Sequence, residues 1–115
     1  MLAKNLAKKI ARLSLEKKAE NVLVMYLRPL TSMTDYFVIC TGATNTHVKA
    51  ISDHIIQSLK KEKIRPLHVE GYTNQEWVLV DYIDVVVHVF QPEKREFYSL
   101  ERLWGDAEVE EVKDE

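Results

Sequence analysis

The side chains that could carry out covalent or metal chemistry are few and far apart in this sequence. Cys40, the only cysteine, lies inside the run VICTG, where a small buried apolar side chain is expected and no base stands beside it. Of the four histidines, even His47 and His54 are seven residues apart, which is too far along a helix for one metal ion to bridge. The chain holds three glycines, too few for a glycine-rich phosphate loop. We expect no catalytic residue, no metal site and no cofactor.

Nucleotidyl transfer is the enzymatic alternative, because a strand that ends at Thr41 and leads into a helix resembles the start of nucleotidyltransferase domains. Such enzymes hold magnesium with two carboxylates on one strand face, which a spacing of i, i+2 supplies. Asp81 and Asp84 are three positions apart across an expected turn, and neither Asp35 nor Asp53 has an acidic residue two positions away. The pattern therefore argues against this enzyme activity.

The elements that must position the remaining side chains follow from hydrophobic spacing. Apolar residues that recur every three or four positions predict helices, and short β-branched runs predict strands. The expected helices are 2–14, a helix capped at 44–46 that runs to about 63, and a helix from Pro92 to a cap at Gly105; the expected strands are 22–27, 35–41, 66–70, 76–81 and 84–90. In the last helix Phe97, Leu100 and Leu103 or Trp104 should point inward. This order predicts an α/β fold with a mixed five-stranded sheet and flanking helices.

The last two expected strands form a hairpin with two unlike faces. If Tyr82 and Ile83 alone make the turn, Leu79 pairs with Val86, although Tyr-Ile is poor chemistry for a tight turn. Valines then fill one face. The other face holds Trp77, Leu79, Val86 and His88, with Phe90 beyond. Two interpretations of this second face stay open: a partner site, because aromatic residues are enriched at contacts, or a face covered by a helix.

Length and composition indicate one globular domain. The chain has 115 residues, 46% hydrophobic and 30% charged, with a net charge of -2, which does not suit a whole surface built for nucleic acid. No apolar run is long enough to cross a membrane, and no secretory signal pattern is present, so we expect a cytoplasmic protein without a membrane contact. Residues 1–105 are predicted to form the domain, and the acidic residues 106–115 a disordered tail.

The N-terminal stretch has the opposite charge, with six basic and two acidic side chains among residues 1–21. It is either an amphipathic helix with a solvated cationic face or a contact for phosphate or an acidic partner.

Several segments together resemble the ribosomal silencing factor family, also called Iojap. They are LEKKAENVLV (Leu15–Val24), TDYFVICTGAT (Thr34–Thr44), EG (Glu70–Gly71), WVLVDYIDVVVHVF (Trp77–Phe90) and REFYSLERLWGDA (Arg95–Ala107). The match runs from about residue 7 to 107 in the family's order. Ile83 stands where the family usually has Gly, which suggests a turn wider than two residues.

The resemblance implies a non-catalytic protein with a nucleotidyltransferase-like fold. Such a protein binds the large ribosomal subunit at its fourteenth ribosomal protein and sterically blocks joining of the small subunit, which represses translation when nutrients are limiting. A role in large-subunit assembly through the same contact is the alternative. The basic N-terminal helix could add a minor contact with ribosomal RNA, and the resemblance leaves monomer and homodimer open.

The resemblance also singles out partner-binding candidates. Aromatic and histidine side chains would make the apolar and hydrogen-bonded contacts, and Arg95 would pair with an acidic group or an RNA phosphate at the rim. The candidates are Trp77, Tyr82, His88, Phe90, Arg95, Tyr98 and Trp104.

Overall fold

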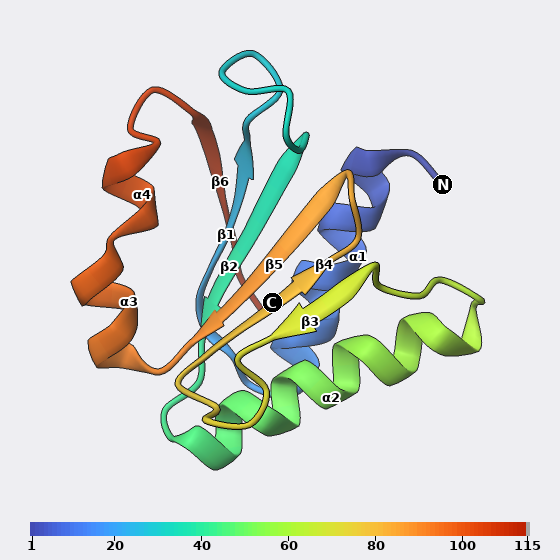
Figure 1. Ribbon diagram of the computed structural model, residues 1–115, viewed down its shortest axis with the longest axis vertical. Coiled ribbons are helices and arrows are strands. Elements are labelled where there is room, and N and C mark those ends of the chain that lie inside the picture. Colours follow the sequence, from blue (N-terminus) through green and yellow to red (C-terminus); the bar gives the residue numbers. More distant parts are fainter. Residues whose placement is uncertain (115) are drawn as a thin grey trace.

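A mixed β-sheet runs through the centre of the molecule and separates two unequal layers of helices (Figure 1). The structure, a computed structural model, describes residues 1–114. Along the chain the elements are α1 (Ala3–Glu16), β1 (Glu20–Tyr26), β2 (Tyr36–Thr41), α2 (Asn45–Lys61), β3 (His68–Glu70), β4 (Trp77–Asp81), β5 (Val85–Phe90), α3 (Pro92–Tyr98), α4 (Leu100–Leu103) and β6 (Glu108–Val112). The strand order is β3-β4-β5-β2-β1-β6, and β2 with β5 is a parallel pair whereas the other neighbours are antiparallel. The predicted mixed sheet with flanking helices is confirmed, with six strands in place of five.

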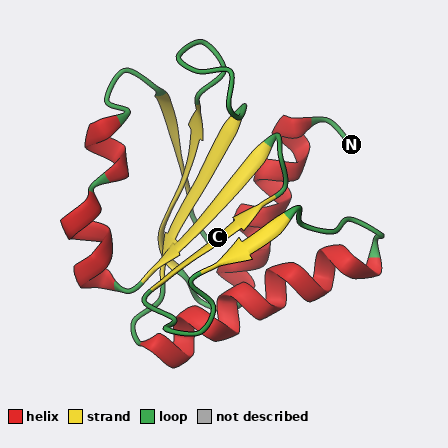
Figure 2. Cartoon of the chain, in the orientation of Figure 1, coloured by secondary structure: helices red, strands yellow, loops and turns green. Residues whose placement is uncertain are grey.

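The two long helices, α1 and α2, pack on one face of the sheet, as Figure 2 shows. Their apolar stripes meet the valine face of the hairpin, so that Ile10, Ile55, Val80 and Val87 are fully buried in one cluster. Each such side chain contributes about 1.5–3 kcal/mol through burial. Thr44 caps α2 by accepting the backbone N–H of His47 at 3.1 Å, in line with the cap expected at 44–46. No helix within residues 1–114 is long and apolar enough to cross a membrane.

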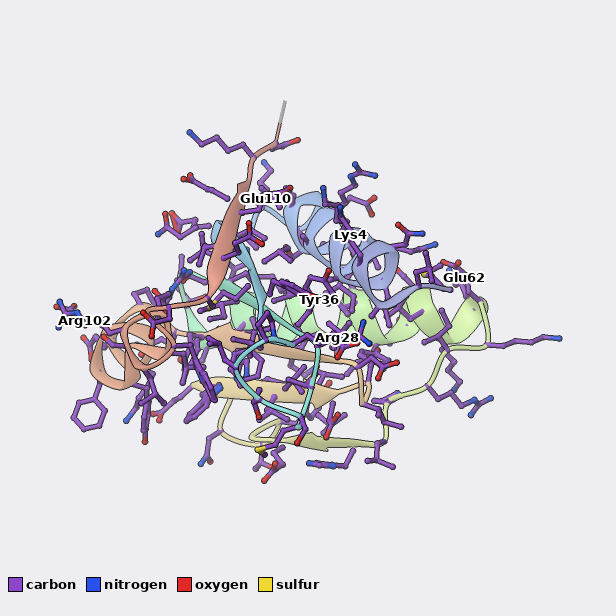
Figure 3. The ribbon with its side chains drawn as sticks, turned by 90° about the horizontal axis from the view of Figure 1, so that it is seen from above. Lys4, Arg28, Tyr36, Glu62, Arg102 and Glu110 are labelled. Carbon is purple, nitrogen blue, oxygen red and sulfur yellow. The ribbon has the colours of Figure 1, made fainter. Side chains whose placement is uncertain are left out.

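The acidic C-terminal segment differs from its prediction as a disordered tail. Residues 108–112 form β6, which pairs antiparallel with β1 along the edge of the sheet. Lys8 of α1 lies 3.2 Å from the Glu110 carboxylate, so the basic first helix supplies a countercharge to β6. The acidic sequence of this segment does not by itself predict a strand. Figure 3 shows Glu110 and the α1 residue Lys4 on the same side of the molecule. Glu115, also part of the predicted tail, lies outside the described residues.

The β4–β5 hairpin is wider than a two-residue turn. Leu79 pairs with His88 instead of Val86, a shift of two residues that leaves every side chain on its predicted face. The Asp84 N–H donates to the Tyr82 carbonyl at 2.9 Å around Ile83, whose φ is 73°. The Ile83 N–H in turn donates to the Asp81 carboxylate at 2.7 Å. A positive φ at a β-branched residue is the local cost of this turn.

The predicted last helix is broken in two. Ser99 adopts a left-handed conformation with φ 45°, and its N–H donates to the Arg95 carbonyl at 2.9 Å, which ends α3. After this break Leu100 is buried, whereas Phe97 and Leu103 are exposed. The inward placement predicted for Phe97 is therefore wrong, and that for Leu100 is confirmed.

Candidate partner-binding site

The face of the sheet opposite α1 and α2 is only partly covered. The α3–α4 segment lies along one side of this face (Figure 1) and closes a second, smaller apolar cluster with strands β1, β2 and β5. The buried members of that cluster are Met25, Leu27, Ile39, Phe90 and Leu100. The interpretation that a helix covers this face therefore holds in part: the α3–α4 pair covers one side, and no other helix of residues 1–114 packs on this face. The interpretation of the face as a partner site stays a prediction.

Aromatic side chains form a continuous row from α3 across the sheet. The ring of Tyr98 lies 4.5 Å from Trp77, and Trp77 stacks on Phe90 at 4.9 Å between centroids. His88 continues the row, with its ring 4.5 Å from Phe37 in an edge-on contact. Rings held in such mutual contact are rigid, so they can bind a partner with little loss of conformational entropy. We call these side chains the aromatic row; they are Phe37, Trp77, His88, Phe90, Phe97 and Tyr98.

Two of its side chains are the most accessible. Tyr98 is 44% exposed and Phe97 is 78% exposed, and both project from the short helix α3. Nearby on α4, Leu103 is 72% exposed. The sequence prediction turned Phe97 inward because it treated 92–104 as one helix. Of the alternatives Leu103 or Trp104, Trp104 is the one that packs inward, and Leu103 is exposed. The available signal was Ser99, since serine favours helix ends over helix interiors.

His88 is held neutral at the centre of this face. Trp77 Nε1 donates to His88 Nδ1 at 3.1 Å, and the His88 side chain is almost fully buried. Burial disfavours the charged imidazolium and lowers the pKa of His88 to about 3. Because the indole N–H can only donate, Nδ1 is the acceptor and the ring proton is on Nε2. Among the described residues this Nε2–H has no acceptor.

A cavity of about 270 Å³ opens beside His88 on the uncovered part of the face. Its walls are mostly apolar, with carboxylates and an imidazole at the rim. The lining residues are Thr31, Met33, Thr34, Phe37, His68, Glu70, Leu79, Asp81, Val86, His88 and Trp104. The cavity and the aromatic row share His88 and Phe37, so they form one continuous surface.

Gly71 fixes the backbone beneath the aromatic row. It has φ +76°, and a Cβ there would lie 1.9 Å from the carbonyl oxygen of Trp77. Only glycine combines that conformation with such a close approach. The loop that Gly71 begins therefore sets the position from which Trp77 enters β4.

Four of the predicted site residues lie on this surface and three are placed differently. Trp77, His88, Tyr98 and Trp104 come together there, although His88 is reached only through the cavity. Phe90 is fully buried beneath Trp77, so it supports the surface from below. Tyr82 is buried in the other cluster, with α1 and α2, where burial raises the pKa of its hydroxyl to about 12. Tyr82, a predicted partner-binding candidate in the hairpin turn, is therefore not accessible at the surface.

Arg95 also departs from its expected place at the rim. Its Nε lies 3.3 Å from the Glu101 carboxylate, and its other donors reach the Thr41 hydroxyl at 2.8 Å and the Asn21 carbonyl. The side chain is 11% exposed. The guanidinium thus ties α3 and α4 to the ends of β1 and β2, and we assign it a structural role.

The chemistry available elsewhere in residues 1–114 is limited. No group of three His, Cys, Asp or Glu side chains in that range is placed to hold a metal ion. Burial raises the pKa of the Cys40 thiol to about 12, which keeps it in the protonated, weakly nucleophilic form. What the fold and the site define is an α/β domain with one sheet face buried by helices and aromatic side chains gathered on the other.

Known proteins with the same pattern identify the family. The family described as "Ribosomal silencing factor during starvation" matches residues 2–115. The ribosomal silencing factor RsfS of Bacillus subtilis is 41% identical over 92 residues, which cover 80% of this chain and 78% of the relative. The mouse protein named "Mitochondrial assembly of ribosomal large subunit protein 1" is 34% identical over 77% of this chain and 40% of its own length. A crystal structure from Chromobacterium violaceum superposes with a TM-score of 0.88 at 31% identity, covering 100% of this chain and 92% of the other.

The chain belongs to the ribosomal silencing factor family. The resemblance noted in the sequence is thereby confirmed, and so is the α/β class of the fold.

Proposed function

We propose that this protein represses translation under nutrient limitation by binding the large ribosomal subunit at its fourteenth ribosomal protein and blocking the small subunit from joining. The observation that carries the proposal is the aromatic row on the uncovered sheet face. An exposed cluster that includes Tyr98 and Phe97 has no role in the core of the protein, and clusters of this composition are typical of protein–protein contacts.

Steric exclusion is sufficient for the proposed mechanism. A rigid domain bound at the subunit interface occupies space that the small subunit needs, so joining is inhibited in proportion to the fraction of large subunits that carry the protein. The Cα radius of gyration of 12.7 Å makes the bound domain large enough to keep two surfaces apart. No turnover is required, and the proposed action is that of a cytoplasmic binding protein without enzyme activity or cofactor.

The test is sedimentation of the purified protein with separated ribosomal subunits through a sucrose gradient. We expect the protein to migrate with the large subunit alone and to reduce the amount of joined ribosomes after the small subunit is added. Tyr98→Ala should weaken both effects about tenfold or more. The matched control is Tyr72→Ala, which removes an exposed tyrosine that contacts Asp53 of α2 on the helical side. A wild-type protein that stays at the top of the gradient at low salt would overturn the proposal.

A role in large-subunit assembly is the second candidate, and the name of the mouse relative favours it. It requires the same contact with the large subunit but at a different time. The two roles are separated in cells that lack the protein. An assembly factor predicts immature large subunits during rapid growth, whereas a silencing factor predicts normal subunits and excess joined ribosomes during starvation.

A minor contact with ribosomal RNA through α1 is a further part of the proposal. Lys8 and Lys9 are engaged with Glu110 and Glu62, so fewer cations are free than the sequence suggests. The remaining basic side chains on α1 would add an affinity that falls as salt rises.

A further inference from the structure

The unused hydrogen-bond donor of His88 is the observation from which this inference starts. The side chain is 4% exposed, and its Nδ1 is occupied by the Trp77 indole N–H at 3.1 Å. The proton therefore resides on Nε2, which finds no acceptor in the described part of the chain. Buried donors are almost always paired in folded proteins, because an unpaired one loses its hydration without compensation. A donor left unpaired beside a cavity indicates that the acceptor comes from outside.

The cavity beside His88 indicates what kind of group enters. Phe37, Leu79, Val86 and Trp104 line it with apolar surface. A volume of about 270 Å³ is enough for one or two side chains of a polypeptide and too small for a folded element. A single donor in apolar walls suits a neutral acceptor oxygen, such as a backbone carbonyl, next to an apolar side chain.

Carboxylates at the rim indicate the charge of the entering segment. Glu70 of β3 and Asp81 of β4 both line the cavity, and His68 lies between them at 3.1 Å and 3.8 Å. The side chains of Glu70 and Asp81 are 66% and 22% exposed, so a cation can approach both carboxylates from solvent. Arginine or lysine from a partner would complement this rim.

We propose that the cavity beside His88 receives a basic segment of the partner protein, which places an acceptor oxygen on His88 Nε2 and a cationic side chain at Glu70 and Asp81. This inference rests on the proposed function, because the partner is the large-subunit protein that the aromatic row contacts. It adds a polar, specificity-determining contact to a surface that is otherwise apolar. Apolar contacts tolerate many partners, whereas a buried donor rejects those that bring no acceptor.

The first experiment replaces His88 and measures binding to purified large subunits. His88→Phe keeps an aromatic ring between Phe37 and Phe90 but removes the donor, and we expect affinity to fall about tenfold. His88→Gln keeps an N–H donor and an acceptor for Trp77, and it should recover most of the affinity. Thermal unfolding of both variants establishes that the folded fraction is unchanged at the temperature of the assay.

The second experiment tests the cationic part of the segment through charge. The double variant Glu70→Gln, Asp81→Asn keeps an acceptor for the Ile83 N–H but removes both charges. Because ribosomal RNA is an anion, loss of negative charge at an uninvolved site should leave subunit binding unchanged or strengthen it. The charge-matched control is the double variant Glu16→Gln, Glu62→Gln. Glu16 is the last residue of α1, and Glu62 follows the last residue of α2. Figure 3 shows Glu62 on the side of the molecule away from Arg102 of α4. We expect the rim variant to bind several-fold more weakly and the control not to.

The outcomes separate this inference from the function on which it rests. If wild-type protein does not bind large subunits, the proposed function fails. If wild-type protein binds and Tyr98→Ala does not, but His88→Phe binds as wild type does, the function stands and the donor contact is overturned. Equal effects of the rim and control double variants would overturn the cationic part.

Discussion

At the scale of single residues, the burial of His88 makes the stability of the fold depend on pH. Its pKa of about 3 in the folded protein lies below the ordinary value of 6.5, so the unfolded chain binds a proton between these values and the folded chain does not. The contribution of neutral His88 to stability is therefore fully present above about pH 6.5 and is lost as pH falls toward 3. The other charged side chains of the cavity, Glu70 and Asp81, are the same in wild type and in a His88 variant, so a comparison of the two proteins isolates His88.

The prediction concerns the difference in unfolding free energy between wild type and His88→Gln. Glutamine does not titrate, so the advantage of wild type should be constant above pH 7 and shrink by about 2–3 kcal/mol between pH 7 and pH 4. Urea unfolding at three pH values measures it. Parallel pH profiles for the two proteins would show that folding leaves the pKa of His88 unchanged, and would contradict the prediction.

A second residue-scale prediction concerns the strained hairpin turn. Ile83 is exposed and has φ 73°, a conformation that costs a β-branched residue about 1–2 kcal/mol. Ile83→Gly removes this strain at a smaller entropic cost, so we expect stability to rise by about 0.5–1 kcal/mol. Ile83→Ala keeps a Cβ and should gain less. The urea midpoints of the three proteins decide the matter, and a glycine variant less stable than the alanine variant would contradict the prediction.

At the scale of elements, β6 owes its existence to its neighbours. Its sequence, EVEEV, is too acidic to be recognised as a strand, and it is ordered by pairing with the free edge of β1 and by Lys8 of α1. Removing residues 108–115 should lower the unfolding free energy by roughly 2 kcal/mol through lost backbone hydrogen bonds and expose the β1 edge. Glu110→Gln removes only an exposed ion pair and should change stability by less than about 0.5 kcal/mol.

Calorimetry and sedimentation velocity test the β6 prediction together. The truncated protein should unfold at a lower temperature and self-associate as concentration rises, because an unpaired strand edge can pair with another copy. A truncated protein that melts as wild type does and remains monomeric would show that β6 adds nothing to the domain.

The helices and strands that the sequence predicted are those whose own apolar spacing indicates the element. The two long helices and the four inner strands carry a clear apolar pattern, and the hairpin faces were predicted because alternation survives a register shift of two. The exceptions depend on tertiary context. The acidic β6 pairs with β1 and has Lys8 of α1 beside Glu110. On either side of the break at Ser99, Arg95 bonds to Thr41 and Leu100 packs in the second cluster.

The sequence predicted which side chains of the candidate site share a sheet face, but it did not predict how deeply each is buried. Pattern alone placed Trp77, His88 and Phe90 on one face, and the structure agrees. It could not show that Phe90 lies beneath Trp77 or that Tyr82 is buried against the helices, because burial depends on which elements cover a face. The cavity beside His88 also has no signature in the sequence, since its walls come from loops and strands far apart along the chain.

At the scale of the whole molecule, the two faces of the sheet have different tasks. The face covered by α1 and α2 holds most of the buried apolar side chains, including Ile51 and Ile55, and supplies most of the stability. The opposite face has a small cluster under α3–α4, and beyond it the aromatic row reaches the solvent. Stability and binding are thus carried by opposite sides of one sheet, and substitutions should affect one without the other.

Phe97→Ser and Ile55→Ala form the corresponding pair of variants. Phe97 is mostly exposed and contacts chiefly the ring of Tyr98, so its loss should change the unfolding free energy by less than about 0.5 kcal/mol while weakening subunit binding several-fold. Ile55 is fully buried, and its truncation should cost about 2–5 kcal/mol while the molecules that remain folded bind as wild type does. Denaturant unfolding and subunit binding measured on the same preparations give both quantities.

A correlated loss would contradict this division. If Phe97→Ser destabilised the fold as strongly as Ile55→Ala, α3 would be held in place by its exposed ring, and weaker binding would then reflect unfolding of α3. The contacts favour independence, because α3 is already fixed through Arg95, which reaches Thr41 of β2 and Glu101 of α4 without involving Phe97. Phe97 and Tyr98, the exposed members of the aromatic row, can therefore vary in sequence, and with them the affinity for a partner, while the opposite face keeps the domain folded.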